Sequence, residues 1–165
     1  MKQLVLVAIA FITFSCSQAQ KTTFSKEALS EKLSATDGSQ VTFKNILKKY
    51  KGKTLVIEVW ASWCGDCVKA MPKLKELQAN NPDVSYLFLS ADKTADKWKA
   101  GIEKHELNKG DHYMMNDGMK GVFGKAIDLD WIPRYIIIDK TGKIVLYRAI
   151  ETDFEKINST LQSLK

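Results

Sequence analysis

The sequence predicts an α/β fold in which helices flank a central mixed β-sheet. Residues 54–59 and 84–90 are mostly apolar and rich in side chains that favour strands, so each segment predicts a buried strand. Between them, apolar residues recur every three positions, as on one face of a helix. A strand, a helix and a second strand in this order predict a parallel pair. Residues 135–139 and 144–147 flank a four-residue turn and predict an antiparallel pair, which makes the sheet mixed.

The segments before the first core strand predict a β-hairpin and a short helical turn. Residues 37–38 are Asp-Gly, a turn signal between two short extended pieces within residues 30–43. Residues 45–50 can form a helical turn, which Lys-Gly-Lys at 51–53 interrupts. We therefore expect an N-terminal hairpin ahead of the core.

The segment after the second core strand predicts an additional helix and strand. Residues 94–107 predict a helix whose core contacts are Trp98 and Ile102. Residues 108–113 lead into a short extended piece, and residues 117–127 predict a weaker helix.

The C-terminal segment predicts a helix with a distinct start and a clear apolar face. Residues 152–155 are Thr-Asp-Phe-Glu, which is the spacing of a capping box. The apolar face consists of Phe154, Ile157, Leu161 and Leu164.

Residues 1–19 predict a leader. They begin with a basic residue, Lys2, and continue with an apolar run over residues 4–12, which is the layout of a secretory signal. The run is shorter than the roughly 20 residues that a permanent transmembrane helix needs. We therefore expect the folded part of the chain to be exported.

Two positions could end this leader. Residues 17–19 are Ser-Gln-Ala, a small-x-small site that would release a soluble protein beginning at Gln20. Residues 15–17 resemble a bacterial lipobox, in which cleavage before Cys16 would leave that cysteine lipidated. A retained membrane anchor is the third alternative. In each case one folded domain, residues 23–165, follows the leader.

The composition is that of an ordinary globular domain. The chain has 165 residues, of which 45% are hydrophobic and four are tryptophan, so it can bury a sizeable core. Its formal net charge is +6, but the lysines are scattered among acids and form no long block. Export and the missing basic stripe argue against nucleic acid as a partner. The charge could favour acidic partners or membrane surfaces, but the sequence localises no such patch.

The chain has three cysteines, and their positions limit the chemistry that it can perform. Cys16 belongs to the leader or its lipid anchor, so Cys64 and Cys67 are the two thiols of the domain. A Cys-x-x-Cys between a strand and a helix predicts a redox-active pair. A structural disulfide is one alternative, and a zinc site that includes His105 and His112 is another, although their spacing matches no common finger.

The order of these segments resembles the thioredoxin fold. The sequence Trp-Cys-Gly-Asp-Cys at 63–67 follows the first core strand, and Ile-Pro at 132–133 precedes a later one. The chain is particularly similar to exported thiol-disulfide oxidoreductases of the TlpA/ResA type. In that family a hairpin precedes the core, and a β–α insertion separates the cysteine motif from the proline. The resemblance covers residues 23–165.

The resemblance implies a dithiol/disulfide centre. Cys64 lies at a helix N-terminus, where free amides and the helix dipole favour a thiolate, and is the expected nucleophile. Cys67, one turn later, is the expected resolving cysteine, since their spacing suits the Cα separation of about 5–6 Å in a disulfide. Gly65 is small enough for a partner's backbone to approach. Trp63 is expected to cover the sulfurs, with substrate contact as the alternative.

Ile132 and Pro133 form the expected substrate-binding loop. Pro133 resembles the family's cis-proline, whose loop faces the cysteines and pairs with the substrate backbone. Ile132 precedes it as in thioredoxins, and simple packing is the alternative role. The sequence assigns no role to the next residue, Arg134.

Two acids are expected to tune the centre. Glu58 lies in an apolar strand, where a charge is costly, and matches the buried carboxylate of thioredoxins that is proposed to move protons. An outward-facing strand residue is the alternative. Asp66 lies between the cysteines, where its charge should disfavour the Cys64 thiolate and so stabilise the disulfide. That predicts a reducing potential.

The sequence therefore predicts an exported, periplasmic or lipid-anchored reductase of protein disulfides. It is expected to act as a monomer without a metal or organic cofactor, and to receive electrons from a membrane thiol reductant. A thiol peroxidase is an enzymatic alternative, although its usual motif is missing. A copper metallochaperone using Cys64, Cys67 and a histidine is the non-enzymatic alternative.

Overall fold

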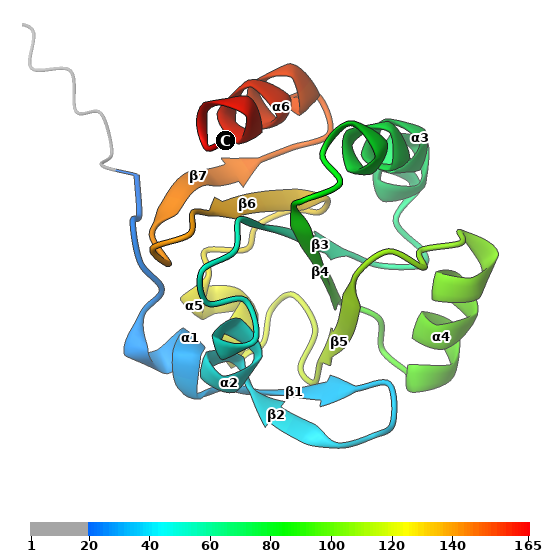
Figure 1. Cartoon of the computed structure of the whole chain (residues 1–165). Coiled ribbons are helices and arrows are strands. Elements are labelled where there is room, and N and C mark those ends of the chain that lie inside the picture. The colour runs from blue at the N-terminus through cyan, green and yellow to red at the C-terminus, as the bar shows by residue number, and fades with distance from the viewer. Residues whose placement is uncertain (1–19) are drawn as a thin grey trace, which may run out of the picture.

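The computed structural model describes residues 20–165, which form a seven-stranded sheet with helices on both faces (Figure 1). The strands are β1 (Lys32–Ala35), β2 (Gln40–Thr42), β3 (Leu55–Trp60), β4 (Ser85–Ser90), β5 (Asp111–Met115), β6 (Arg134–Ile138) and β7 (Ile144–Ala149). The helices are α1 (Lys26–Ser30), α2 (Phe43–Lys48), α3 (Gly65–Asn80), α4 (Ala95–Lys104), α5 (Val122–Ala126) and α6 (Phe154–Ser163). The predicted leader, with Cys16 and both cleavage sites, lies outside the described residues.

The sheet is mixed, as predicted, and its strands lie in the order β2-β1-β5-β4-β3-β6-β7. β3 pairs in parallel with β4, and β4 with β5, while β6 runs antiparallel to β3 and to β7. All six residues of β3 are buried, and so are five of the six in β4. Such two-sided burial explains why both strands are nearly continuous apolar runs.

The N-terminal hairpin joins this sheet through the inserted strand. β1 pairs with β2 around the turn at Gly38, whose φ of +87° suits a glycine, so the predicted hairpin is confirmed. β1 also pairs antiparallel with β5. The insertion made of α4 and β5 therefore widens the sheet and provides the edge on which the hairpin docks.

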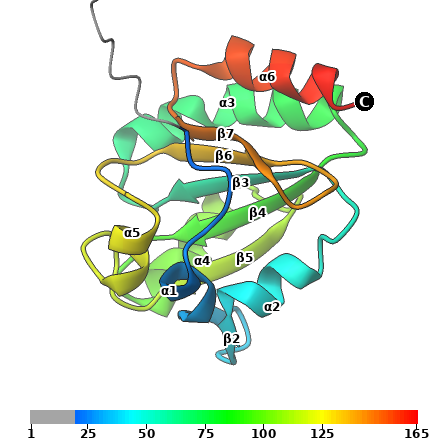
Figure 2. The same ribbon diagram turned by 90° about the vertical axis from the view of Figure 1, so that its left-hand side faces the viewer.

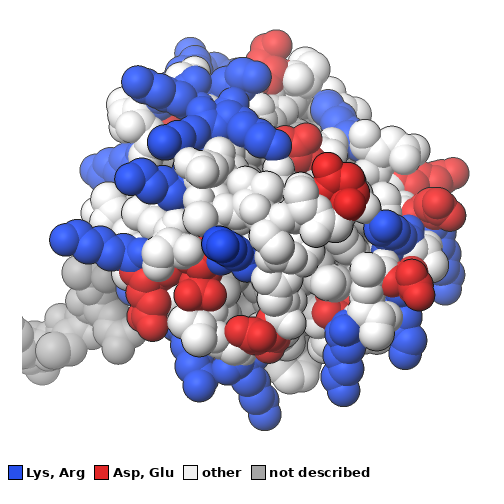
Figure 3. Space-filling view, turned by 90° about the horizontal axis from the view of Figure 1, so that it is seen from below, with Lys and Arg blue, Asp and Glu red and all other residues white. Residues whose placement is uncertain are grey.

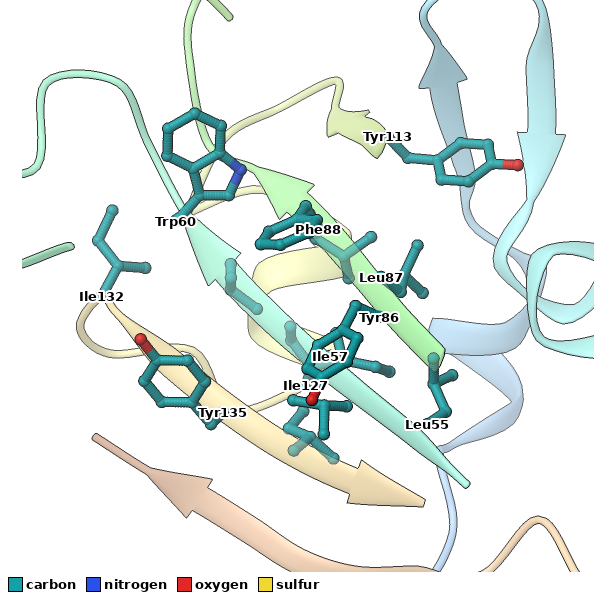
Figure 4. Close-up of a cluster of buried hydrophobic side chains, with 14 of the residues drawn as sticks. Leu55, Ile57, Trp60, Tyr86, Leu87, Phe88, Tyr113, Ile127, Ile132 and Tyr135 are labelled. Carbon is teal, nitrogen blue, oxygen red and sulfur yellow. The ribbon is translucent and has the colours of Figure 1, made fainter. Parts of the chain in front are cut away.

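The helices form two layers, one on each face of the sheet (Figures 1 and 2). Helices α3, α4 and α6 cover one face, where the Tyr135 ring contacts Phe154 of α6 with 5.3 Å between ring centroids. Helices α1, α2 and α5 cover the other, where Phe43 of α2 contacts Phe123 of α5 at 5.0 Å. The core between these layers contains large buried side chains of β3, β4 and β6 (Figure 4).

The C-terminal helix confirms one prediction and corrects another. Ile157 and Leu161 are buried, and Phe154 and Leu164 are partly buried against the core, as its periodicity predicts. The capping box is wrong, because the helix starts one residue later and Asp153 is its N-cap. The Asp153 carboxylate accepts a hydrogen bond from the backbone N–H of Ile150 instead of capping the helix.

The predicted helix over residues 117–127 is shorter than expected, because α5 spans only Val122–Ala126. The preceding residues turn instead, and Gly118 has a φ of +61°, outside the helical region. Within residues 20–165, no helix combines the length and apolar character needed to cross a membrane.

Candidate active site

Cys64 and Cys67 form a disulfide at the start of α3, with their Cα atoms 5.3 Å apart. Cys64 is the N-cap of the helix, and its Sγ accepts a hydrogen bond from the backbone N–H of Cys67 at 3.1 Å. A helix N-terminus presents free N–H groups and the positive end of the helix dipole. This position therefore stabilises negative charge on the Cys64 sulfur once the bond is reduced.

The two cysteine residues differ in their accessibility. Cys64 is 6% exposed, whereas Cys67 is 0% exposed and faces the core from the first turn of α3. A partner can thus reach Cys64 but not Cys67. An attacking cysteine must be reachable, whereas a resolving cysteine need not be, so the roles of Cys64 and Cys67 stay a prediction that this asymmetry favours.

The peptide bond between Ile132 and Pro133 is cis, as the family resemblance implied. The Ile132 carbonyl oxygen lies 3.6 Å from the Cys64 Sγ, so this loop contacts the disulfide directly. Both residues of the dipeptide are buried. The contact between Ile132 and Cys64 places the loop at the carboxyl end of β3, where Trp60 is the last residue, and Figure 4 shows Ile132 and Trp60 toward that end of the strand.

Arg134, to which the sequence assigned no role, is buried and braces the loop before the cis-proline. Its Nη1 donates to the carbonyl oxygen of Arg148 in β7 at 2.8 Å, and its Nη2 pairs with Asp130 at 2.5 Å. Asp130 also pairs with the guanidinium of Arg148. Arg134 therefore ties the segment that precedes Pro133 to the edge of the sheet.

Two exposed tryptophans border the disulfide motif and the proline loop. Trp63 is 59% exposed and Trp131 is 62% exposed. Trp63 also borders a hollow of about 420 Å³ that includes residues 116–120. An exposed indole offers a large apolar contact area, so both residues are candidates for binding a partner. Trp131 was missed by the sequence interpretation, although its place next to Ile132 was a usable signal.

Gly65 and Asp66 lie on the open side of the motif. A side chain at Gly65 would meet no atom within 4 Å, so a partner's backbone has room there. Asp66 is partly exposed, and its Oδ1 lies 3.9 Å from Nζ of the exposed Lys69. Such a solvent-exposed ion pair is weak, so Lys69 compensates little of the Asp66 charge.

Glu58 is buried in the middle of β3, which excludes the outward-facing alternative. Burial raises the pKa of its carboxyl to about 8, although a hydrogen bond from the Tyr135 hydroxyl to Oε1 at 3.2 Å works in the opposite direction. The other oxygen, Oε2, has no hydrogen-bond partner among residues 20–165. Glu58 is therefore poised to gain or lose a proton near neutral pH.

Glu58 faces the layer that contains α3. It is paired in register with Tyr135 on β6, whose ring contacts α6, and it lies two residues before Trp60, whose ring lies against Gly101 of α4. Alternate residues of a strand share one face, so Glu58 points to the same side as these contacts. Cys67 faces the sheet from that same layer. Tyr135 was not predicted from the sequence.

A second buried acid, Asp92, forms hydrogen bonds with the segment just before the cysteines. Asp92 accepts hydrogen bonds from the backbone N–H of Ser62 at 3.0 Å, the Ser62 hydroxyl at 2.6 Å and the Ser90 hydroxyl at 2.8 Å. Ser62 is two residues before Cys64, and Gly101 of α4 packs so closely that a Cβ there would lie 2.6 Å from the Ser62 Cβ. The sequence interpretation missed Asp92, because its partner is 30 residues away.

The described residues contain no candidate metal-binding site. Among residues 20–165, no three His, Cys, Asp or Glu side chains come together in a way that would hold a metal ion. His112 instead stacks on Phe88 and contacts the carbonyl oxygen of Leu107, and His105 lies edge-on to Trp60.

Comparisons with known proteins agree with this geometry. The sequence pattern of the Redoxin family matches residues 17–163. The thiol-disulfide oxidoreductase ResA of Bacillus cereus is 25% identical over 150 residues, which cover 90% of this chain and 82% of that protein. A protein of Bacteroides vulgatus assigned to the thiol-disulfide oxidoreductases is 32% identical, with a TM-score of 0.67 over 85% of this chain and 89% of the other. A Bacteroides fragilis thiol-disulfide oxidoreductase shares the fold, with a TM-score of 0.69 at 24% identity over 85% of this chain and all of the other.

The family match spans nearly the whole described domain, and it includes the disulfide motif at the start of α3. We conclude that the chain belongs to the Redoxin family and has the thioredoxin-like fold of the thiol-disulfide oxidoreductases of the TlpA/ResA type.

Proposed function

We propose that this protein reduces disulfide bonds in other exported proteins, with Cys64 as the attacking and Cys67 as the resolving cysteine. The observation that carries the proposal is the disulfide itself, which is accessible only through Cys64 and lies against the cis-proline loop. Family membership supports the same chemistry.

The reaction begins with the reduced protein. The Cys64 thiolate attacks one sulfur of the substrate disulfide, whose S–S bond breaks and releases one substrate thiolate. The Cys67 thiolate then attacks the Cys64 Sγ, which breaks the mixed disulfide and releases the second substrate thiolate. Two electrons thus pass from the protein to the substrate, and the Cys64–Cys67 bond forms. The chemistry uses this bond and needs no metal or organic cofactor.

Glu58 would accept the proton that Cys67 loses before its attack. Cys67 is sealed from solvent, so bulk water cannot take this proton directly. Glu58 lies beneath the same helix layer and has a pKa of about 8, and one of its oxygens accepts no hydrogen bond from the described part of the chain, residues 20–165. A carboxyl with such a pKa is partly ionised near neutral pH and can act as a general base.

The cis-proline loop and the exposed tryptophans would hold the substrate. The backbone next to Ile132 and Pro133 would pair with an extended substrate segment, as the resemblance implies. Trp63 and Trp131 would cover its side chains, while Gly65 leaves space for the approach.

The charge of Asp66, which Lys69 compensates only weakly, supports reduction as the direction of the reaction. Negative charge beside Cys64 disfavours the thiolate and hence stabilises the disulfide form, which makes the dithiol a stronger reductant. Electrons would come from a thiol reductant in the membrane. The signal-like pattern of residues 2–14 supports an exported, periplasmic protein, either released after Ala19 or lipid-anchored through the lipobox-like Cys16. We propose that it acts as a monomer.

Insulin reduction tests the activity. With dithiothreitol as electron donor, we expect residues 20–165 to precipitate insulin rapidly and the Cys64→Ser variant to lose this activity. Cys67→Ser should accumulate a mixed disulfide with its substrate, and trapping it in the native host would identify the client proteins. Stoichiometric copper binding without insulin reduction would favour a metal carrier instead.

A further inference from the structure

A groove lined by lysines lies between α2 and the β6–β7 turn. Its volume is about 260 Å³, and its apolar floor contains Leu29, Leu47, Leu55 and Ile138. Five lysines line it: Lys44, Lys48, Lys51, Lys53 and Lys140. Figure 3 shows Lys and Arg gathering at the upper left of the view, which is the side of α2 and the loop after it. The structure thus localises a basic patch that the sequence alone did not.

The positive charge of this groove is uncompensated. All five lysines are exposed, and within residues 20–165 none of them has an ion-pair partner. The carboxylate in the lining belongs to Asp139, which accepts hydrogen bonds from the N–H of Thr141, the Thr141 hydroxyl and the N–H of Lys143. Asp139 is therefore engaged in its own turn and does not pair with the lysines.

The groove and the disulfide lie at opposite ends of the central strand. Leu55, the first residue of β3, lines the groove, whereas Trp60, its last residue, leads into the motif. Figure 4 shows these two residues at the two ends of the strand. Six residues of strand span about 20 Å, so a partner in the groove leaves the disulfide free.

The chain enters the domain beside the groove. The carbonyl oxygen of Thr22 accepts a hydrogen bond from the N–H of Ile144 at 2.8 Å, directly after the turn that contains Lys140. Cys16 precedes Thr22 by six residues, which reach at most about 20 Å when fully extended. Lys21, one residue before Thr22, pairs with Asp128 in the segment that leads to the cis-proline loop. A lipid on Cys16 would therefore hold the domain near a membrane within reach of both ends of β3, and the lysine groove would decide which end faces the bilayer.

We propose that the lysine groove docks this end of the domain on the anionic surface of a membrane, so that the disulfide faces away from the bilayer. Anionic headgroups attract clustered lysines near the surface, and the attraction falls off within a Debye length. The orientation relative to Cys16 rests on the proposed export, whereas the affinity of the groove for anionic lipid does not.

Vesicle binding by residues 20–165 tests this surface without the leader, since these residues contain the whole sheet and its core. The chain should sediment with phosphatidylcholine vesicles that contain phosphatidylglycerol, not with phosphatidylcholine alone, and less as the salt concentration rises. The triple variant Lys48→Gln, Lys51→Gln and Lys53→Gln should bind at least about tenfold more weakly, because each lysine near the surface contributes attraction.

A triple variant on α4 is the matched control. Lys97, Lys99 and Lys104 are equally exposed, so their change to Gln removes the same charge from another surface. We expect binding within about twofold of the unmodified domain, as for charges held beyond a Debye length from the bilayer. Equal losses in both variants, or no binding of the unmodified domain to anionic vesicles, would overturn the proposal.

Two further arms distinguish other anionic ligands. Release from vesicles by inorganic phosphate, but not by chloride at equal ionic strength, would make the groove a site for free phosphate. Binding to polyglutamate but not to vesicles would point to an acidic protein. Both triple variants should reduce insulin at the unmodified rate, so failure of the oxidoreductase proposal would appear separately.

Discussion

The charged side chains near the two ends of β3 differ in their exposure to solvent. In the carboxyl half of β3, Glu58 is buried within the strand, and one of its oxygens has no partner in residues 20–165. Just beyond the strand, Asp92 is buried against Ser62 of the cysteine motif. At the amino end, the lysines of the groove are exposed and surrounded by water. A buried charge changes stability and proton affinity, whereas an exposed charge acts mainly on approaching partners and is screened by salt.

This difference separates the chemistry from the docking surface. Changes at the carboxyl end should alter the pH dependence, the rate or the reduction potential of the protein. Changes at the amino end should leave these properties unaltered and affect only association. Each prediction below tests one side of this contrast.

The largest effect is expected for Glu58→Gln. The pKa of Glu58 in the folded chain, about 8, lies above its ordinary value of 4.5, so between these pH values the folded state binds more protons than the unfolded state. The contribution of Glu58 to stability should therefore be complete below pH 4.5 and be lost as the pH rises to about 8. At 1.36 kcal/mol per pKa unit, this loss is on the order of 5 kcal/mol. Urea unfolding of the oxidised protein from pH 5 to 9 should show it, and Glu58→Gln should remove it.

The exposed end supplies the control for this measurement. Lys48→Gln should leave the pH dependence unchanged, because an exposed surface substitution usually alters stability by less than about 0.5 kcal/mol. Glu58→Gln should also slow the release of substrate from the mixed disulfide, by roughly 100-fold if Glu58 acts as the general base. An unchanged release rate would contradict the proton-transfer role.

A smaller effect is expected for Asp92→Asn. The carboxylate now accepts hydrogen bonds from donors of Ser62 and Ser90. The amide nitrogen of Asn cannot accept a hydrogen bond, so at least one of these donors would lose its acceptor. Loss of hydrogen bonds to a charged acceptor costs about 1.5–3 kcal/mol of stability. Because Ser62 positions the loop before Cys64, insulin reduction should also slow by about tenfold.

Ser90→Ala separates the two consequences of Asp92→Asn. It removes the bond that the Ser90 hydroxyl donates to the Asp92 carboxylate and the bond that this hydroxyl accepts from the Asp92 N–H, but it leaves both bonds to Ser62. It should therefore reduce stability by about 2 kcal/mol without slowing insulin reduction. If both variants slow the reaction equally, Asp92 supports the fold in general and does not position the motif.

Local sequence patterns were sufficient to predict most of the fold. Burial on both faces made β3 and β4 recognisable as apolar runs, and the Asp-Gly turn marked the hairpin. The cysteine pair was found for the same reason, because its meaning depends on the adjacent strand and helix. The failures were also local: Gly118 turns the chain where a helix was expected, and Asp153 caps no N–H of its own helix.

The residues around the cysteines were only partly predictable. Tyr135 meets Glu58 across 77 positions of sequence, through a register between β3 and β6 that no local pattern encodes. Asp92 follows a strand as an ordinary polar residue would, and its importance appears only when Ser62 comes within hydrogen-bond distance. The lysine groove likewise combines residues from α2, the loop after it and a distant turn.

The smallest effect is expected for a substitution of Asp66. This residue tests the difference between buried and exposed charges, because it lies next to the cysteines and is nevertheless partly exposed to solvent. Its ion pair with Lys69 is weak. Asp66→His would replace a negative charge beside Cys64 by a neutral or positive one, which favours the thiolate and hence the dithiol form. The reduction potential should rise by about 30 mV, a tenfold change in the equilibrium constant with glutathione.

Lys69→Gln is the control and should shift the potential much less, since an exposed pair contributes little. An unchanged or lower potential in Asp66→His would mean that solvent screens Asp66 as completely as the groove lysines, and that the reducing direction has another origin.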